Sequence, residues 1–287
     1  MSNSKVRNKV KVAVDLLNSF KDDHPHKDVK IILDDGKIEA SKFVLAARSE
    51  YFKKMFADDH RFKESQENAV IVPCKKIVMN KVIEYLYGGE LNIDGLAMVE
   101  VFECLDLLRM MMLDDAFDII DRELLVNNID SYPPLDYLPA LELAEFHEFE
   151  QHPRQMMHII FEEANIGTIL NHPEAIAKLS KAVVLKTLDA AWTATAINKF
   201  RFFKSWIDTD GRNEDVKWAS KIAQDNFELI NFRIEDLLGE VKKSKLFNDA
   251  DINNALIEVS RIMEKQLHNY RVHAENIDKI LRNSLRN

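Results

Sequence analysis

Apolar and polar residues alternate between residues 28 and 40, which is the pattern of two short β-strands. The apolar residues of 29–33 fall mostly on one face, because successive side chains of a strand point to opposite faces. Ile32 lies on the second face and predicts that this face is partly covered as well. We expect Asp35-Gly36 to form the two-residue turn of a hairpin, and residues 37–40 to return as the partner strand.

Apolar residues at helical spacing follow the hairpin and predict two short helices. Residues 42–47 are too apolar to lie exposed. Ser49 is well placed to cap the second helix, since a serine hydroxyl can accept a hydrogen bond from a free backbone N–H group of the first turn. The second helix carries one apolar stripe, made of Tyr51, Phe52, Met55 and Phe56. We expect both helices to pack back on the hairpin.

Short strands and helices continue to alternate along the rest of this first part. Residues 69–72 predict a strand, and the apolar spacing of residues 79–86 predicts a helix that Gly88-Gly89 ends. Residues 90–93 have the pattern of a brief strand, and residues 96–108 that of an apolar helix. A small sheet with many helices indicates an α+β module.

Glycine and proline are unevenly placed along the chain, because four of the seven glycines precede residue 100 and no proline follows Pro173, and the later part of the chain reads as helical. The clearest break is Ser131-Tyr132-Pro133-Pro134, since a residue before proline is disfavoured in the α region. We therefore predict a mixed domain over residues 1–130, an all-α domain over residues 131–250 and a helical segment over residues 251–287.

Composition limits the partners and the compartment. A net charge of -9 argues against a nucleic-acid surface, which needs clustered Lys and Arg. The two cysteines show no pairing pattern, as expected in a reducing compartment. There is no apolar run of about 20 residues and no signal peptide. We expect a soluble protein of the cytoplasm, with the nucleus as an alternative, and neither nucleic acid nor membrane as a partner.

Histidines and carboxylates form no catalytic pattern. His24 and His26 stand close together, but no cysteine or carboxylate lies at a spacing typical of zinc sites. A glycine-rich phosphate-binding loop is also missing from the sequence. We expect no catalytic residue, no metal site, no cofactor and no enzymatic activity.

Four stretches of the chain, in order, resemble the BTB (POZ) domain over about residues 5–127. They are D-V-x-I-I-L followed by D-G, F-V-L-A-A-R-S-E-Y-F-K-K-M-F, E-Y-L-Y-G-G-E-L and C-L-D-L-L-R-M. The resemblance implies that Asp28 and Lys42 are the acidic and basic residues of a charged pocket near a dimer interface. Two ordinary surface charges are the alternative.

The resemblance also implies a homodimer that involves an N-terminal helix over residues 5–20. One face of this helix is apolar and carries Val6, Val10, Val14 and Leu17. The face packs either on its own domain or on a second protomer. Four positions depart from the family pattern and affect the expected dimer contacts: Ser41 replaces a usual His, Cys104-Leu105 an Ala-Ala pair, and Arg109 a Gln.

The segment Phe62-Lys63-Glu64, followed by Ser65, resembles the motif of BTB proteins that act as cullin-3 adaptors. In such a contact Phe62 would bury its ring in a groove of the cullin, which contributes about 1.5–3 kcal/mol. The carboxylate of Glu64 would accept a hydrogen bond. A turn with one incidentally buried Phe is the alternative.

The helical half resembles the BACK domain over about residues 132–250. The shared features are Leu138, Leu141, Leu143, Ala144, Phe203 and Trp206. The aromatic cluster around Phe203 is more typical of a core than of a binding site. The fold class is therefore an α+β BTB/POZ domain, a small sheet with surrounding helices, followed by an all-α BACK-like helical domain.

Residues 251–287 predict one long helix or a helical pair. Apolar residues recur there every three or four positions, at Ile252, Leu256, Val259, Met263, Leu267, Tyr270, Ile277 and Leu281. We expect this segment to fold back onto the helical domain. A free coiled coil is the alternative.

Two functions fit these patterns. The first is a substrate-specific adaptor of a cullin-3 RING ubiquitin ligase, which homodimerises through the BTB domain and holds an unknown protein substrate. The second is a BTB scaffold, or a regulatory or decoy protein, that oligomerises or recruits other partners without delivering a substrate.

Overall fold

The computed structural model of the protein describes residues 27–57, 68–123, 129–149, 151–190, 194–209 and 216–284. The chain divides into two compact units, unit 1 over residues 1–156 and unit 2 over residues 157–287. This division falls inside helix α9 (Gln151–Ile160). The sequence places its first domain boundary earlier, between residues 130 and 131, and that boundary stays a prediction.

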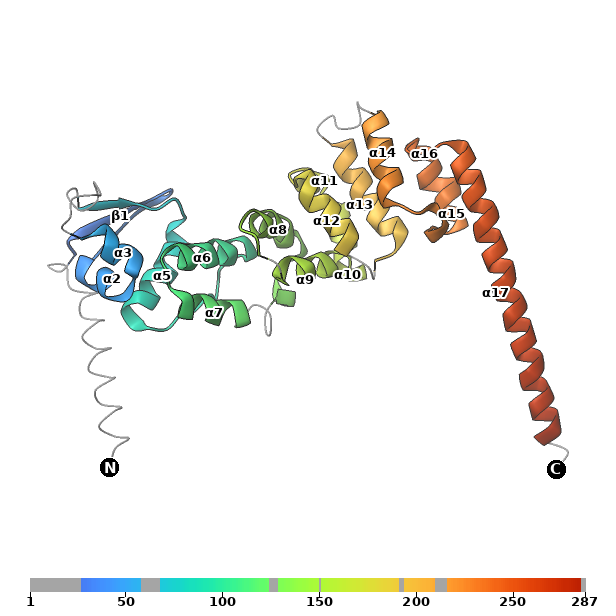
Figure 1. Ribbon diagram of the computed structural model, residues 1–287, viewed down its shortest axis with the longest axis horizontal. Helices are drawn as coiled ribbons and strands as arrows, with labels where there is room; N and C mark the ends of the chain where they lie inside the picture. The colour runs from blue at the N-terminus through green and yellow to red at the C-terminus, as the bar shows by residue number, and fades with distance from the viewer. Residues whose placement is uncertain are drawn as a thin grey trace. The chain divides into compact units, whose positions relative to one another are not determined.

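A three-stranded sheet in the order β2-β1-β3 opens the described part of unit 1 (Figure 1). β1 (Val29–Leu33) pairs antiparallel with β2 (Gly36–Ala40) and parallel with β3 (Ala69–Ile71). Alternate residues of β1 are buried, which confirms the predicted period of two. Ile32 on the second face is 43% exposed, so that face is only partly covered.

The hairpin turn lies one residue earlier than the sequence predicts. Leu33 pairs with Gly36, so Asp34-Asp35 forms the turn and Gly36 begins β2. The carboxylate of Asp35 accepts a hydrogen bond of 2.6 Å from the backbone N–H of Lys76. Because Asp35 is held in the turn in this way, the positive φ of 155° falls on Gly36 at the start of the strand.

Six α-helices of unit 1 follow in the described residues, before α9. The helix after Ser49 is capped as predicted, since the Ser49 hydroxyl accepts a hydrogen bond of 3.4 Å from the backbone N–H of Phe52. α2 packs on α3, and α6 packs on its neighbours α5, α7 and α8. The helices are α2 (Lys42–Arg48), α3 (Glu50–Met55), α5 (Lys76–Gly88), α6 (Met98–Met110), α7 (Asp114–Glu123) and α8 (Tyr137–Phe146).

Residues 90–93 do not form the brief strand that the sequence predicts. The side-chain oxygen of Asn92 accepts a hydrogen bond of 2.6 Å from the backbone N–H of Asp94. A local turn of this kind competes with the hydrogen bonds of a strand ladder.

Unit 2 is helical throughout its described residues and has an aromatic core. Phe200, Phe202, Phe203 and Trp206 are buried on α13, as predicted for core residues. The indole N–H of Trp206 donates a hydrogen bond of 2.9 Å to the carbonyl oxygen of Leu179. The helices after α9 are α10 (Glu163–Leu170), α11 (Pro173–Ile176), α12 (Lys181–Ala190), α13 (Ala196–Asp208), α14 (Val216–Asn226), α15 (Ile234–Asp236), α16 (Lys242–Ser244) and α17 (Asp249–Ser284).

The expectation that the C-terminal segment folds back is wrong. α17 is one continuous helix, and its sequence contains no glycine or proline that would break it. Only its first turns pack on unit 2, where Ile252, Ala255 and Val259 are buried. Residues 260–277 are exposed, and Figure 1 shows the helix continuing beyond α15 and α16.

Candidate functional site

The candidate site on unit 1 surrounds residues 58–67, the segment that contains the predicted cullin-binding residues. Phe62 and Glu64 themselves lie outside the described residues. The chain on both sides is described, up to the end of α3 and from the start of β3. The site can therefore be built from the contacts that hold the two ends of the segment.

Lys42 joins these two ends. Its Nζ donates a hydrogen bond of 2.5 Å to the side-chain oxygen of Asn68, which immediately precedes β3. The same ammonium lies 5.4 Å from the centroid of the Phe56 ring, directly after α3. The backbone of Asn68 is tied as well, because its carbonyl oxygen accepts a hydrogen bond of 2.9 Å from the N–H of Lys30.

Asp28 and Lys42, the predicted charged pair, lie close together. The Asp28 carboxylate contacts the backbone of Lys42 and not its ammonium. The carboxylate of Asp28 accepts a hydrogen bond of 2.7 Å from the backbone N–H of Lys42. It thereby satisfies a free N–H group at the start of α2, where the side chain of Ser41 makes no such bond. The ammonium of Lys42 remains directed to Asn68 and Phe56.

Two further polar contacts fix α2 and α3. The Tyr87 hydroxyl accepts a hydrogen bond of 2.8 Å from the backbone N–H of Ser41, and burial raises the pKa of this phenol. The Ser49 hydroxyl donates a hydrogen bond of 2.8 Å to the carbonyl oxygen of Met111, at the end of α6. Both serines are buried, so these bonds are shielded from water.

Sequence reasoning missed Asn68 as a member of this site. Asn68 has a φ of 51°, in the left-handed region that asparagine adopts more readily than most residues. An asparagine directly before a predicted strand was therefore the available signal. Phe56 was assigned only to an apolar stripe, although its ring also faces a lysine ammonium.

The residues that depart from the family pattern take part in the packing of unit 1. Cys104 and Leu105 are fully buried, and burial raises the pKa of the Cys104 thiol to about 12. Arg109 lies 5.2 Å from the ring centroid of Phe117 and 4.6 Å from that of Phe149. The predicted dimer residues Val6, Val10, Val14 and Leu17 lie outside the described residues.

A buried histidine lies in the same region of unit 1. His152 is 2% exposed, and its Nε2 lies 3.3 Å from Oδ1 of Asp121. Its ring meets those of Phe102 and Phe149 edge to face. Burial lowers the pKa of His152, and the nearby Asp121 carboxylate opposes this shift only in part.

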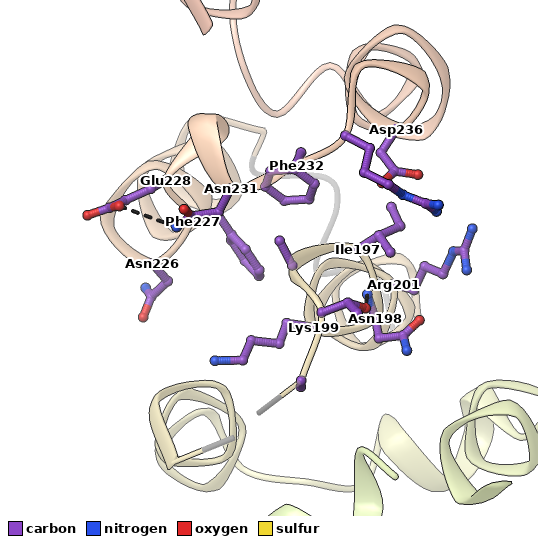
Figure 2. A pocket seen from close by; sticks show the side chains of 14 residues that line it. Ile197, Asn198, Lys199, Arg201, Asn226, Phe227, Glu228, Asn231, Phe232 and Asp236 are labelled. Carbon is purple, nitrogen blue, oxygen red and sulfur yellow. Dashed lines mark hydrogen bonds and ion pairs between the residues drawn. The ribbon is translucent and has the colours of Figure 1, made fainter. Parts of the chain in front are cut away.

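A pocket of about 720 Å³ in unit 2 is a second candidate site (Figure 2). It lies between α13 and the segment that joins α14 to α15, with Phe227 and Phe232 in its wall. Its two arginines are engaged, because Arg201 forms an ion pair with Glu240 and Arg233 one with Asp236. The pocket is therefore lined by both polar and apolar side chains, and its two arginines are already paired.

Two classes of site find no support in the part of the chain that the structure describes. Within those ranges, no group of three or more His, Cys, Asp or Glu side chains is arranged to hold a metal ion. Among the described helices, none has the length and apolar character needed to cross a membrane.

Comparison with known proteins finds similarity to BTB proteins. Kelch-like protein 36 of Bos taurus is 28% identical over 125 residues, which cover 43% of this chain and 19% of that protein. BTB/POZ domain-containing protein 9 of Drosophila melanogaster is 24% identical over 238 residues, which cover 82% of this chain and 31% of that protein. The chain thus spans less than a third of the length of these curated relatives.

A solved structure and a family model also match part of this chain. The BTB domain of human gigaxonin matches with 14% identity and a TM-score of 0.32, over 40% of this chain and 90% of that chain. The family model described as BTB/POZ domain matches residues 17–120. This range contains the whole three-stranded sheet and the helices that pack around it. Residues 17–120 of this chain are therefore a BTB/POZ domain.

Proposed function

We propose that the protein is a non-catalytic interaction adaptor that joins a cullin-3 ubiquitin ligase to a protein substrate. The BTB/POZ match over residues 17–120 carries this proposal, together with the likeness to Kelch-like proteins. Phe62 and Glu64 are the proposed cullin contacts. Transfer of ubiquitin would be carried out by other members of the ligase, which the adaptor brings close to the substrate.

The contacts of the Lys42 ammonium with Phe56 and Asn68 support a binding role for residues 58–67, which lie between these two residues in the sequence. Ordering a segment on binding costs conformational entropy, and that cost is lower when its ends are already fixed. Lys42 holds one end at Phe56 and the other at Asn68. In our proposal the free energy from Phe62 and Glu64 is then available for binding the cullin.

The remaining parts of the chain have roles in this proposal as well. The BTB domain pairs two copies of the chain, with Val6, Val10, Val14 and Leu17 on the shared face and with Asp28 and Lys42 nearby. Residues 131–250 form a BACK-like domain, and the substrate is held by the helical part of the chain. The complex works in the cytoplasm, or in the nucleus as the alternative.

Calorimetric titration of the full chain with the N-terminal region of cullin-3 tests the proposed contact. We expect Phe62→Ala combined with Glu64→Ala to weaken binding by more than about 2 kcal/mol, as for a central hydrophobic anchor. Phe146→Ala with Glu84→Ala is the matched control, since both of these residues are exposed and lie outside the segment. Absence of binding, or equal binding by both double variants, would favour the scaffold or decoy function instead.

Light scattering separately tests the proposed BTB dimer. We expect a dimer mass at micromolar concentration and a shift toward the monomer in Val10→Asp with Val14→Asp. A clean monomer mass for the unmodified chain would contradict the dimer and leave the cullin contact to the titration.

A further inference from the structure

The middle of α17 presents an apolar stripe that the described residues of unit 2 leave exposed. Met263, Leu267 and Tyr270 are 54%, 53% and 74% exposed. They continue, at spacings of three and four residues, the face that packs on unit 2 through Ile252 and Val259. The stripe is thus an extension of an existing packing interface along the same helix.

A helix of this kind needs a partner along its exposed length. Residues 260–277 span about 27 Å at 1.5 Å per residue. An isolated helix of this length is marginal in water, and most helical stability in proteins comes from packing of an apolar face. A partner with a complementary apolar stripe would therefore stabilise this part of α17 by packing on it.

The charged residues beside the stripe indicate which partner covers it and in which direction the partner helix runs. In a coiled coil in which Leu267 and Tyr270 are core positions, Glu264 and Arg271 lie on one edge, seven residues apart. The other edge carries the uncharged Gln266 and a histidine, His273. In an antiparallel pair like edges face each other, so Glu264 of each helix meets Arg271 of the other. A parallel pair would place Arg271 beside Gln266, without an ion pair.

The register that forms these ion pairs also fits the exposed stretch. It places Leu267 opposite Tyr270 of the other helix, and Met263 opposite the small Ala274. The centre of this register lies between residues 268 and 269, which is the middle of the exposed stretch 260–277. The buried first turns of α17 then stay outside the paired region.

We propose that α17 is a self-association helix, which pairs antiparallel with α17 of a second copy of this chain through Met263, Leu267 and Tyr270. Reciprocal Glu264–Arg271 contacts set the direction and the register. This pairing is independent of the proposed cullin contact and of the proposed BTB dimer, because every residue that it uses lies on α17.

Charge reversal in the full chain tests the direction of pairing. A fluorophore is attached through Lys265→Cys, on the face of α17 away from the stripe, and energy transfer between donor-labelled and acceptor-labelled copies is measured. The natural cysteines are buried, so the introduced thiol reacts selectively. We expect E264R alone and R271E alone each to raise the midpoint concentration for transfer by about tenfold. Mixing E264R copies with R271E copies should restore the original midpoint, because both ion pairs re-form between unlike chains.

Matched controls separate pairing from general effects of charge or folding. Glu275→Arg reverses a charge of α17 away from the paired edges and should leave the midpoint unchanged. Leu267→Asp should abolish transfer, whereas Val272→Asp on the opposite face should not. Circular dichroism of each variant shows whether the helix is retained.

Two outcomes would overturn the proposal. Absence of transfer in the unmodified chain up to high micromolar concentration would mean that a second copy does not cover the stripe. Transfer that E264R leaves unchanged, or that mixing does not restore, would mean that the helices do not pair antiparallel in this register.

Discussion

Around α2 and α3 of unit 1, polar side chains join distant segments of the chain, whereas around α13 of unit 2 distant segments meet mainly through aromatic rings. Ser49 donates to the carbonyl oxygen of Met111, and the hydroxyl of Tyr87 accepts from the N–H of Ser41. In unit 2 the ring of Phe200 instead contacts the rings of Phe227 and Phe232 edge to face. These two regions thus use different interactions to join segments that are distant in the sequence.

This difference affects how strictly each set of contacts limits the residue types that can make it. A hydrogen bond between a side chain and a particular backbone group requires a specific residue type at one position. A ring in a core can be replaced by another apolar side chain of similar volume at a cost that is usually below about 1.5 kcal/mol. The side-chain to backbone bonds of Ser49 and Tyr87 should therefore tolerate fewer residue types than the ring contacts of Phe200 do.

The largest expected effect comes from the aromatic core of unit 2. Phe203→Ala should lower the free energy of unfolding by about 3–5 kcal/mol, because Phe203 is fully buried between the rings of Trp206 and Phe227. Urea unfolding followed by tryptophan fluorescence measures this cost, since all three tryptophans of the chain lie in unit 2.

Phe146→Ala is the control for that measurement, because Phe146 is 80% exposed and its loss should change stability by less than about 0.5 kcal/mol. Phe203→Leu should cost less than half as much as Phe203→Ala. If the leucine variant is as unstable as the alanine variant, then ring geometry is as specific as a hydrogen bond, and the contrast between the units fails.

A single hydroxyl of unit 1 should have the next largest effect. Ser49→Ala removes both the cap of α3 and the bond to Met111, which should lower stability by about 1–3 kcal/mol. Hydrogen exchange of the backbone amides in α3 and at the end of α6 should report this loss, with Ser260→Ala on the exposed surface of α17 as the control. Unchanged protection at both places would show that these polar contacts do not organise unit 1.

Acid should weaken unit 1 through His152. Burial keeps the pKa of His152 below its ordinary value of 6.5 in the folded protein, so the unfolded chain binds a proton first as the pH falls. The stability that this residue contributes is therefore complete above pH 6.5 and declines below it. Urea unfolding of unit 1 between pH 7.5 and 5, followed by tyrosine circular dichroism, should show a smaller decline in His152→Gln. Equal slopes in both proteins would assign the effect to other groups.

The smallest effect is expected where unit 2 does use a long-range polar contact. Arg201 and Glu240 pair across 39 positions of the sequence, but both side chains are more than 40% exposed. Solvent screening should limit the loss in Arg201→Met to about 1 kcal/mol or less, measured by the same tryptophan fluorescence. A loss as large as that of Ser49→Ala would show that polar contacts matter equally in both units.

Much of the fold was predictable because it depends on local patterns. The alternation in 29–33, the cap at Ser49 and the helix stop at Gly89 each follow from residues near one another in the sequence. The hairpin turn was placed one residue too late, because the bond from Asp35 to Lys76 joins positions 41 apart and has no local signature. The prediction that residues 251–287 fold back was wrong for a similar reason, since apolar spacing does not show which surface will cover the apolar residues.

The candidate site was predictable only in part. Asp28 and Lys42 are brought together, but the partners of the Lys42 ammonium depend on where Asn68 and Phe56 lie after folding. The residues proposed to bind the cullin rest on the family resemblance alone. A pattern of three residues identifies chemistry that a partner can recognise, but it carries no information about the geometry around it.

The contacts of Lys42 with Asn68 and Phe56 affect how this domain tolerates insertions and substitutions between residues 57 and 68. Lys30 of β1 and Lys42 of α2 both hold Asn68, and the next residue, Ala69, pairs with Lys30 in the sheet. A longer or altered stretch between Phe56 and Asn68 would therefore leave the strand register unchanged, because loop closure becomes costlier only slowly with length. The register of β1 and β3 is thus set by residues outside 58–67, so a change of sequence within that range is separable from the pairing of the two strands.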